Sequence, residues 1–236
     1  EREGKSGIEA SYDRFLRGIS GSRVIETNSS NTYYTQIAEK KPTSGKNLHL
    51  YLDRQLQKVS YEALKEAVEK KGATGGAVVA SDPKTGGILA LVSYQAFDAN
   101  ALSKGISASE YSDLLADTRK PFFNRTISAT YPPGSTFKMV TSLAALSTGT
   151  ITPQTLVNCP SFISIGAFVY RDWFSGGRGP INVKQALQVS CDTFFYTVGG
   201  GFEGQKGAGI EAISDFAGKL GFGKVSGIDI TGEVSG

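Results

Sequence analysis

The residues whose types and spacing could do chemistry are a serine and a lysine three positions apart, Ser135 and Lys138. They lie in Tyr-Pro-Pro-Gly-Ser-Thr-Phe-Lys, a stretch that begins at residue 131 and runs into the apolar segment 139–146. Two prolines end whatever precedes, Gly134 gives the turn its freedom, and good helix formers follow. The pattern predicts a turn that leads into a helix, with Ser135 in the first helical turn and Lys138 on the same face.

A serine hydroxyl is a strong nucleophile only when a base takes its proton, and a lysine one helical turn away can be that base. Such a lysine must be neutral, so its pKa has to fall by roughly three from about 10.4, which corresponds to about 4 kcal/mol. Burial and nearby positive charge lower the pKa of a lysine, and a helix N-terminus favours a developing alkoxide. The pair therefore suggests acyl transfer through Ser135. The competing interpretation is a helix start with a solvated lysine.

Two other short motifs have the spelling of a catalytic signature but the composition of a turn. Ser81-Asp-Pro-Lys84 repeats the Ser-x-x-Lys pattern, with a proline just before its lysine. Lys84-Thr-Gly86 overlaps it, between strand-like segments at 76–81 and 87–93. Because Asp-Pro followed by a glycine is typical of a hairpin turn, we expect both motifs to be structural.

A second polar pair, Ser190 and Asp192, interrupts the apolar segment 183–198, which is predicted to form one helix. Buried polar groups need hydrogen-bond partners. We therefore expect this pair to meet the face that carries Ser135 and Lys138. The competing interpretation is a serine and an aspartate that bond only within their own helix.

The stretch from Gly149 to Pro180 lacks a regular pattern and is predicted to be a long loop. Such a loop usually marks a working surface. It carries Tyr170, Arg171 and Trp173, and aromatic side chains beside an arginine could line a substrate groove. A packed loop anchor is the alternative.

Composition gives general limits. The chain has 236 residues, enough for one large or two small domains, and its 39% apolar and 20% charged residues are ordinary for a soluble globular protein. A formal charge of +3 without a Lys/Arg block gives no indication of a nucleic-acid partner. No run approaches the roughly 18 apolar residues that a spanning helix needs. Because the chain opens on Glu-Arg-Glu-Gly-Lys, without a signal peptide or initiator Met, we expect it to be part of something longer.

The chain has two cysteines, Cys159 and Cys191, and one histidine, His49. A structural zinc site takes about four ligands, so we expect no metal site. The single histidine excludes a Ser-His-Asp or Cys-His mechanism unless His49 takes part. We expect both cysteines to be free thiols, because Cys191 is predicted to lie in the middle of a helix among apolar neighbours.

The remaining segments show ordinary helix and strand patterns after a polar stretch at 1–47. Strand-like runs lie at 22–26, 31–37 and 48–52, and helices are predicted near 53–70, 110–118 and 209–219. Residues 221–233 are predicted to be a glycine-rich loop with a strand-like piece.

The stretches 131–138 and 189–196, in this order and spacing, resemble the transpeptidase domain of class B penicillin-binding proteins of the elongation type. Further stretches agree with it, at 4–9, 16–18, 52–57, 82–93 and 227–233. The resemblance implies an α/β (α+β) fold of the penicillin-binding protein and serine β-lactamase kind, here incomplete. It further implies that 1–47 is a remnant of the pedestal-like N-terminal region and that 48–236 is the N-terminal part of the transpeptidase domain.

The resemblance also implies an activity. Ser135 would attack the D-Ala-D-Ala amide of a peptidoglycan stem peptide, or a β-lactam, and form an acyl-enzyme, with Lys138 as the base. Ser190 would pass the proton toward the leaving amine, and Asp192, in the place of the family's Asn, would hold the network. An amine of a neighbouring stem peptide would then take the acyl group and complete a D,D-crosslink, with no metal or organic cofactor. The backbone N–H of Ser135 would be the first oxyanion donor.

The implied partners are stem peptides, β-lactam antibiotics and, in the full-length protein, a glycan polymerase and the elongation complex, but no nucleic acid. The implied location is the bacterial cell envelope, on the extracytoplasmic face of the inner membrane, with the anchor outside this chain. The family's K-T-G strand, which supplies the second oxyanion donor, does not occur between the second motif and Gly236. Because losing one such donor costs about 10²–10³ in rate, we expect the chain by itself to be an impaired acylator.

Two alternatives stay open. A class D-like β-lactamase or β-lactam sensor also uses Ser-Thr-Phe-Lys, although the Ser-Cys-Asp triplet and the polar N-terminal segment argue against it. A non-catalytic cell-wall scaffold would explain the missing third motif, whereas the intact polar pairs argue against it. Turnover of a β-lactam, a stable adduct or no labelling would separate the three hypotheses.

Overall fold

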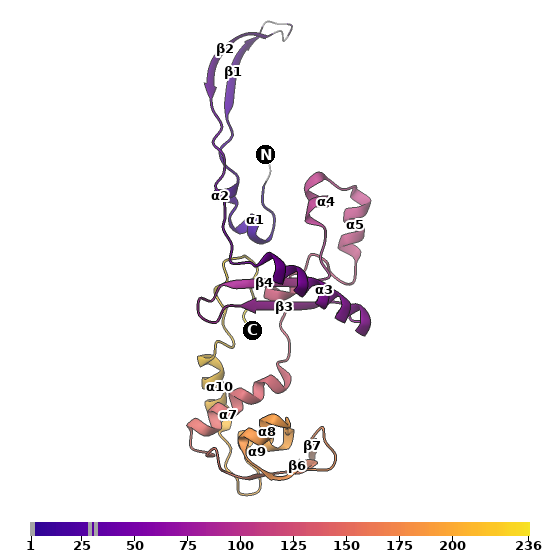
Figure 1. Cartoon of the computed structure of the whole chain (residues 1–236), viewed down its shortest axis with the longest axis vertical. Helices are drawn as coiled ribbons and strands as arrows, with labels where there is room; N and C mark the ends of the chain where they lie inside the picture. Colours follow the sequence, from indigo (N-terminus) through magenta and orange to yellow (C-terminus); the bar gives the residue numbers. More distant parts are fainter. Residues whose placement is uncertain (1–2, 28–29, 31–32) are drawn as a thin grey trace. The chain divides into compact units, whose positions relative to one another are not determined.

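The structure is a computed structural model that describes residues 3–27, 30 and 33–236. Contacts divide it into two units, Glu1–Ala129 with Gly227–Val234 (unit 1) and Thr130–Ser226 with Ser235–Gly236 (unit 2). The elements, labelled in Figure 1, are the following in chain order: α1 (Gly7–Ser11), α2 (Asp13–Leu16), β1 (Ser22–Thr27), β2 (Tyr33–Lys40), α3 (Arg54–Lys71), β3 (Gly76–Ser81), β4 (Ile88–Tyr94), α4 (Ala99–Lys104), α5 (Ala108–Ala116), α6 (Arg125–Ser128), the 3₁₀ helix η1 (Gly134–Phe137), α7 (Lys138–Ser147), β5 (Val157–Cys159), β6 (Phe162–Ile165), β7 (Phe168–Arg171), β8 (Gly179–Ile181), α8 (Val183–Gln188), α9 (Asp192–Gly200) and α10 (Gly209–Lys219).

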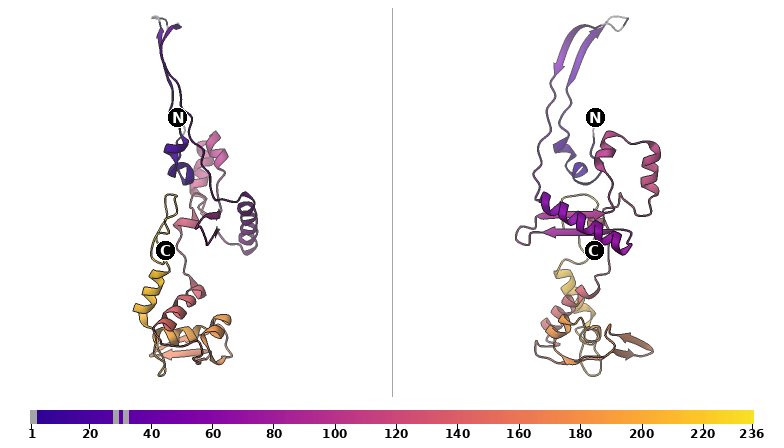
Figure 2. Two further views of the ribbon diagram at one scale, coloured as in Figure 1. Left: turned by 60° about the vertical axis from the view of Figure 1, so that its left-hand side comes forward. Right: turned by 45° about the vertical axis from the view of Figure 1, so that its right-hand side comes forward.

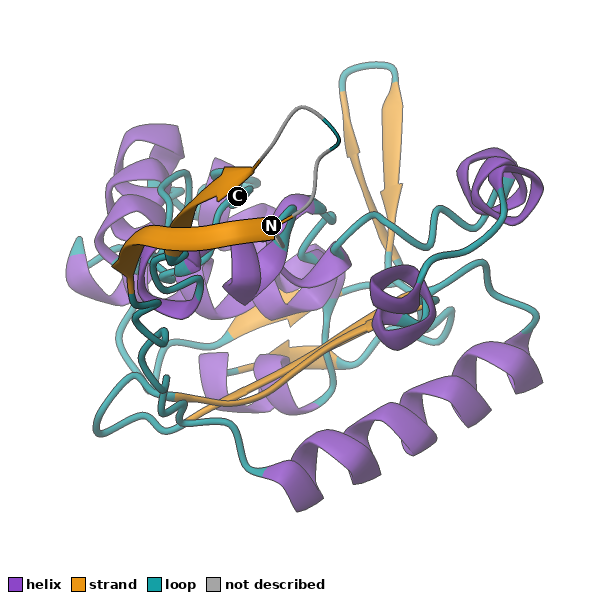
Figure 3. Cartoon of the chain, turned by 90° about the horizontal axis from the view of Figure 1, so that it is seen from above, coloured by secondary structure: helices purple, strands orange, loops and turns teal. Residues whose placement is uncertain are grey.

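In unit 1, the long helix α3 packs against the antiparallel hairpin β3–β4, and Figure 3 shows the helix running beside the two strands. The helix begins at Asp53, whose side chain accepts a hydrogen bond from the N–H of Leu56 at 2.7 Å. It ends at Gly72, which has a φ of +62°. The Gln57 side chain joins helix to strand, because it both donates to and accepts from the backbone of Leu91. The predicted helix and hairpin are therefore confirmed.

The turn between β3 and β4 holds the Lys84-Thr-Gly86 motif. The Asp82 carboxylate accepts hydrogen bonds from the N–H of Lys84 and from Thr85 Oγ1, both at 2.9 Å. Gly86 has a φ of +75°, which a glycine adopts without strain. The polar groups of the turn thus bond to one another within the turn, so the prediction that the motif is structural is confirmed.

Other sequence predictions for unit 1 need correction. Residues 48–52 form no strand, since no described strand pairs with them. The helix predicted near 110–118 is α5, which starts earlier because Ser107 and Glu110 form a capping box. The run 22–26 is part of β1, whereas residues 31–32 of the run 31–37 lie outside the described residues. No strand occurs in 221–233. The backbone of this segment bonds to side chains from elsewhere in unit 1: the N–H of Thr231 donates to Ser11 Oγ, and Ser128 Oγ donates to the carbonyl oxygen of Gly232.

Unit 2 is organised around α9, which packs against α7, α10 and β5. Figure 2 shows α7 and α10 next to each other. Phe194 and Val198 of α9 are fully buried, and the side chains packed with them come from α7, the β5–β8 pair and α8. The predicted helix at 209–219 is confirmed as α10.

The segment predicted as a long loop contains two nested antiparallel pairs, in which β5 pairs with β8 and β6 pairs with β7. We call residues 157–181 the nested hairpin. The loop prediction was wrong here because strands of three or four residues are too short to show a period of two. Among the described residues, no helix is long and apolar enough to cross a membrane.

The single helix predicted over 183–198 is in fact two helices, α8 and α9, separated by residues 189–191. Ser190 has a φ of +53°, in the left-handed region that a residue other than glycine seldom adopts. The Sγ atom of Cys191 accepts the N–H of Phe194 at 3.2 Å, so Cys191 is the N-cap of the second helix. The Ser190–Asp192 motif therefore lies at a break between helices and not inside one.

Cys159 and Cys191 form a disulfide, so the expectation of free thiols was wrong. That expectation placed Cys191 in mid-helix, whereas the break turns it toward Cys159 at the end of β5. Both residues are completely buried. The bond ties the nested hairpin covalently to the start of α9.

We expect the double variant Cys159→Ser/Cys191→Ser to lose about 3–4 kcal/mol of unfolding free energy, because the bond closes a loop with a sequence separation of 32. Urea denaturation of variant and wild type, each with and without reductant, would measure the loss. Reductant should not change the midpoint of the double variant. Equal midpoints for oxidised wild type and variant would contradict the prediction.

Candidate active site

The Pro-Pro-Gly turn delivers Ser135 and Lys138 to one place by local structure. Gly134 has a φ of +55° and opens the 3₁₀ helix η1, which contains Ser135 and continues directly into α7 at Lys138. Ser135 is exposed, whereas Lys138 is only 9% exposed. The interpretation of Lys138 as a solvated lysine is therefore wrong. Serine stands at the surface, and the lysine is buried behind it.

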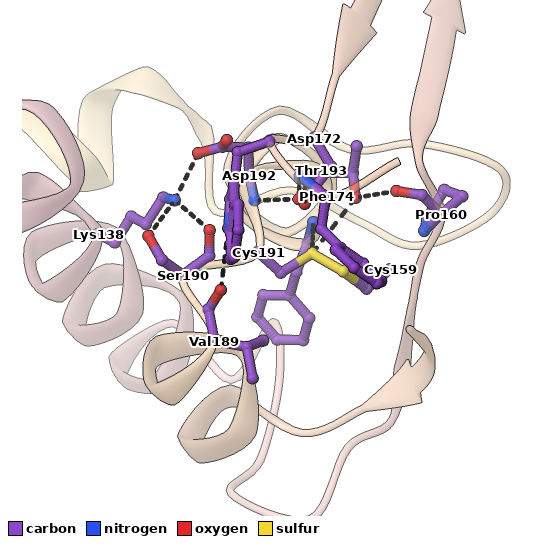
Figure 4. The surroundings of a disulfide bond; sticks show 12 residues. Lys138, Cys159, Pro160, Asp172, Phe174, Val189, Ser190, Cys191, Asp192 and Thr193 are labelled. Atoms are coloured by element: carbon purple, nitrogen blue, oxygen red, sulfur yellow. Dashed lines mark hydrogen bonds and ion pairs between the residues drawn. A yellow bond between two sulfur atoms is a disulfide. The ribbon is translucent and has the colours of Figure 1, made fainter. Parts of the chain in front are cut away.

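The Lys138 ammonium has three acceptors within reach, two on Ser190 in the break between α8 and α9 and one on Asp192, the first residue of α9. Nζ donates to the carbonyl oxygen of Ser190 at 2.8 Å, to Ser190 Oγ at 3.0 Å and to Asp192 Oδ1 at 2.5 Å (Figure 4). These contacts use all three donors of an ammonium group. Nζ also lies 5.6 Å from the centre of the Phe195 ring. The lysine is therefore held in one position by its partners.

Ser190 connects the lysine to the exposed serine. Ser190 Oγ donates a hydrogen bond to Ser135 Oγ at 3.1 Å, and it accepts the bond from Lys138 Nζ. In the described part of the chain, no hydrogen bond joins Lys138 directly to Ser135. The four side chains named from sequence thus form one connected group, and the interpretation in which Ser190 and Asp192 bond only within their own helix is wrong. The chemical role of each remains a prediction.

A buried carboxylate that sequence reasoning missed supports this group from behind. Asp172, which directly follows β7 and is 8% exposed, accepts the N–H of Asp192 at 2.6 Å and the N–H of Thr193 at 3.5 Å through Oδ2 (Figure 4). Its Oδ1 accepts the N–H of Phe174 at 2.9 Å. Nothing in the local sequence marks Asp172, because its main partner lies 20 positions later.

The three residues predicted to bind substrate, Tyr170, Arg171 and Trp173, have different surroundings in the structure. Trp173 is 64% exposed, and its indole N–H donates to the carbonyl oxygen of Val189 at 3.1 Å, next to Ser190. Arg171 instead lies over the Phe162 ring, with 6.0 Å between guanidinium and ring centre. Trp173 is therefore the one of the three that is bonded to the segment carrying the second motif.

Tyr170 packs on Tyr196, with ring centres 5.6 Å apart, and both line an apolar hollow of about 350 Å³ that Ser135 does not line. Burial, and then the carboxylates of Asp192 and Asp172, raise the pKa of the Tyr196 phenol above its ordinary value. Tyr196 is therefore a neutral phenol at physiological pH.

One group of potential metal ligands was found among the described residues, consisting of Cys159, Asp172 and Cys191, with ligand atoms within 4.8 Å of one another. The two sulfur atoms are bonded to each other. Since metals bind the thiolate, these residues do not fit a metal site while the disulfide is intact.

Residues 76–236, which include every residue of this site, match the family described as penicillin binding protein transpeptidase domain. The chain belongs to this family. Residues 1–50 match the penicillin-binding protein dimerisation domain. The resemblance to class B penicillin-binding proteins of the elongation type is thereby confirmed, together with the expected fold.

Individual relatives agree with the family assignment. The peptidoglycan D,D-transpeptidase MrdA of Escherichia coli K12 is 38% identical over 235 residues, which cover 99% of this chain and 35% of that protein. The Helicobacter pylori penicillin-binding protein PBP2, solved in complex with MreC, has a TM-score of 0.78 at 32% identity over 98% of this chain and 41% of that one. Pseudomonas aeruginosa PBP2, solved in complex with WCK 5153, has a TM-score of 0.76 at 31% identity over 98% and 46%. The chain thus spans about a third of the length of the curated relative.

Proposed function

We propose that this penicillin-binding protein chain carries the nucleophile and the base of a peptidoglycan D,D-transpeptidase. Its substrates would be stem peptides that end in D-Ala-D-Ala, and β-lactams would acylate the same serine. The observation that carries the proposal is the continuous hydrogen-bonded path from buried Lys138 through Ser190 to the exposed hydroxyl of Ser135. Such a path connects a nucleophile to a base in the manner that acyl-serine chemistry requires.

In this mechanism the path transfers one proton. For this transfer Lys138 first gives up one proton, and the hydroxyl hydrogens of Ser190 and Ser135 turn toward Lys138 Nζ and Ser190 Oγ, the reverse of the directions in the structure. Ser135 Oγ then bonds to the carbonyl carbon of the substrate while its proton passes to Ser190, which passes its own proton to the deprotonated amine of Lys138. The same path returns a proton to the departing D-Ala nitrogen when the amide C–N bond breaks. Asp192 holds the lysine through the 2.5 Å contact. An acceptor amine then attacks the acyl carbon, the ester bond to Ser135 Oγ breaks, and the proton lost by the amine returns to Ser135 Oγ through the same path, which leaves the amide crosslink.

We assign the contacts with substrate to Trp173 first, because its exposed ring lies beside the segment that carries Ser190. Tyr170 and Arg171 lie on β7, and we propose that they contact parts of the stem peptide or glycan farther from the reacting bond. The indole ring of Trp173 offers a flat apolar face and one polar N–H, which suits contact with a peptide that is apolar along one side.

The domain organisation and the cellular setting are part of the same proposal. We assign 1–47 to a pedestal-like region, which the match of 1–50 to the dimerisation domain supports, and 48–236 to the transpeptidase domain. By analogy with the Helicobacter relative solved with MreC, we propose an elongation complex with a glycan polymerase as the assembly in which the protein acts. We propose the outer face of the inner membrane as the place where it acts.

To test the proposed function, the full-length protein is incubated with a D-Ala-D-Ala pentapeptide and an acceptor amine. In a separate reaction it is incubated with a penicillin. A transpeptidase releases D-Ala, forms the crosslinked product and keeps a stable penicillin adduct on the peptide that contains Ser135. Rapid turnover of the penicillin would instead identify a β-lactamase. No product and no adduct would identify a scaffold, and either result would refute the proposal.

We expect Ser190→Ala to slow acylation by penicillin about 10²-fold, because the variant removes the link between Lys138 Nζ and Ser135 Oγ. The rate of labelling by a fluorescent penicillin measures the effect. Ser164→Ala, at an exposed position on β6, is the matched control and should label at the wild-type rate. A wild-type rate for Ser190→Ala would exclude Ser190 from the proton path.

A further inference from the structure

The break between α8 and α9 is held from several directions by the nested hairpin. Asp172 accepts the N–H of Asp192, Trp173 donates to the carbonyl oxygen of Val189, and Cys159 is bonded to Cys191. Every residue from 189 to 192 except Ser190 is therefore tied to residues 159–173. Ser190 itself is left with its side chain directed to Lys138 and Ser135.

Asp172 is an unusual residue to find at this position. Burying a carboxylate is costly unless it is paired or hydrogen-bonded, and among the described residues no lysine or arginine forms an ion pair with Asp172. Its two oxygens instead accept three backbone N–H groups, of Phe174, Asp192 and Thr193. Two of these belong to the first turn of α9, whose positive dipole end favours an anion.

The bond from Asp172 falls on the peptide group that joins Cys191 to Asp192. Fixing this group fixes the direction in which the chain leaves Ser190, whose left-handed φ of +53° needs support from its surroundings. A displacement of Ser190 by about 1 Å would break its 3.1 Å contact with Ser135 Oγ. The geometry of the second motif therefore depends on a carboxylate that touches neither the nucleophile nor the base.

We propose that Asp172 is a positioning residue for acyl transfer, and that the Cys159–Cys191 disulfide shares the task of holding the Ser190–Asp192 break. This inference rests on the function proposed above. It predicts that Asp172→Asn slows the chemical step and leaves initial binding of the β-lactam unchanged, because the amide oxygen can still accept the N–H of Phe174 and Trp173 keeps its own bond to Val189.

The test compares Asp172→Asn with wild type by measuring labelling at several concentrations of a fluorescent penicillin, which separates the binding constant K from the acylation rate k2. The asparagine can accept on one side only, since its NH₂ group would face a backbone N–H. We expect k2 to fall about 10- to 100-fold with little change in K. Asp53→Asn, a substitution of another helix-capping aspartate in unit 1, should leave both constants unchanged.

The disulfide adds a second arm. In the Cys159→Ser/Cys191→Ser background, Asp172→Asn should cost more in k2 than it does in the wild type, since the two supports then fail together. If Asp172→Asn melts below the assay temperature, k2 is measured for Asp172→Glu instead. The added methylene displaces the carboxylate, so this variant should also have a lower k2. A wild-type k2 in the folded Asp172 variants, or a loss confined to K, would overturn the inference. If wild type labels no better than Ser135→Ala, it is the proposed function that fails.

Discussion

Ser135→Ala is expected to abolish stable labelling by a fluorescent penicillin, with a fall of about 10⁶ in acylation rate. The hydroxyl is the exposed end of the hydrogen-bonded path, and without it the path has no exposed nucleophile to attack the substrate. The fold should be unaffected, because Ser135 is exposed on η1 and its removal leaves no cavity. Gel fluorescence of equal amounts of both proteins measures the loss.

The chain offers a matched control for this substitution. Ser81 begins the other Ser-x-x-Lys copy, at the end of β3 beside the hairpin turn. Ser81→Ala should therefore label like wild type. Labelling that survives in Ser135→Ala, or that is lost in Ser81→Ala, would show that the nucleophile has been assigned to the wrong copy.

Lys138→Arg is expected to lower the acylation rate about 10³–10⁴-fold, although the positive charge next to Asp192 is kept. An arginine cannot be deprotonated in a protein, so it cannot receive the proton of Ser135 through Ser190. The comparison isolates the base from the ion pair. Rates of labelling, with thermal melting to confirm folding, give the measurement, and Lys184→Arg on the exposed side of α8 is the control.

A companion variant separates stability from chemistry at the same position. Lys138→Met leaves Asp192 without its cation, which costs about 3–5 kcal/mol for a fully buried pair and less here because the Asp192 side chain is 26% exposed. Lys138→Met/Asp192→Asn should regain much of the stability but none of the acylation. If either variant acylates at the wild-type rate, the base lies elsewhere and the proton path described above is wrong.

The site was visible in the sequence to the extent that its parts are local. Ser135 and Lys138 are three residues apart behind a Pro-Pro-Gly turn, so the chain alone brings them together. The same holds for α3 with its Asp53 and Gly72 caps, and for the turn that contains Lys84-Thr-Gly86. In each of these segments, the capping or turn residues are close in sequence to the backbone that they hold, so the local sequence is enough to predict the conformation.

Other features could not be read from neighbouring residues. The apolar run 183–198 favours a continuous helix, and it breaks at Ser190 because contacts from the nested hairpin outweigh that local preference. The partner of Cys191 lies 32 residues away and the carboxylate that holds Asp192 lies 20 away, and neither separation leaves a periodic signal. Chain packing alone brings these groups into contact, and it does so at the point where the proposed chemistry needs a fixed geometry.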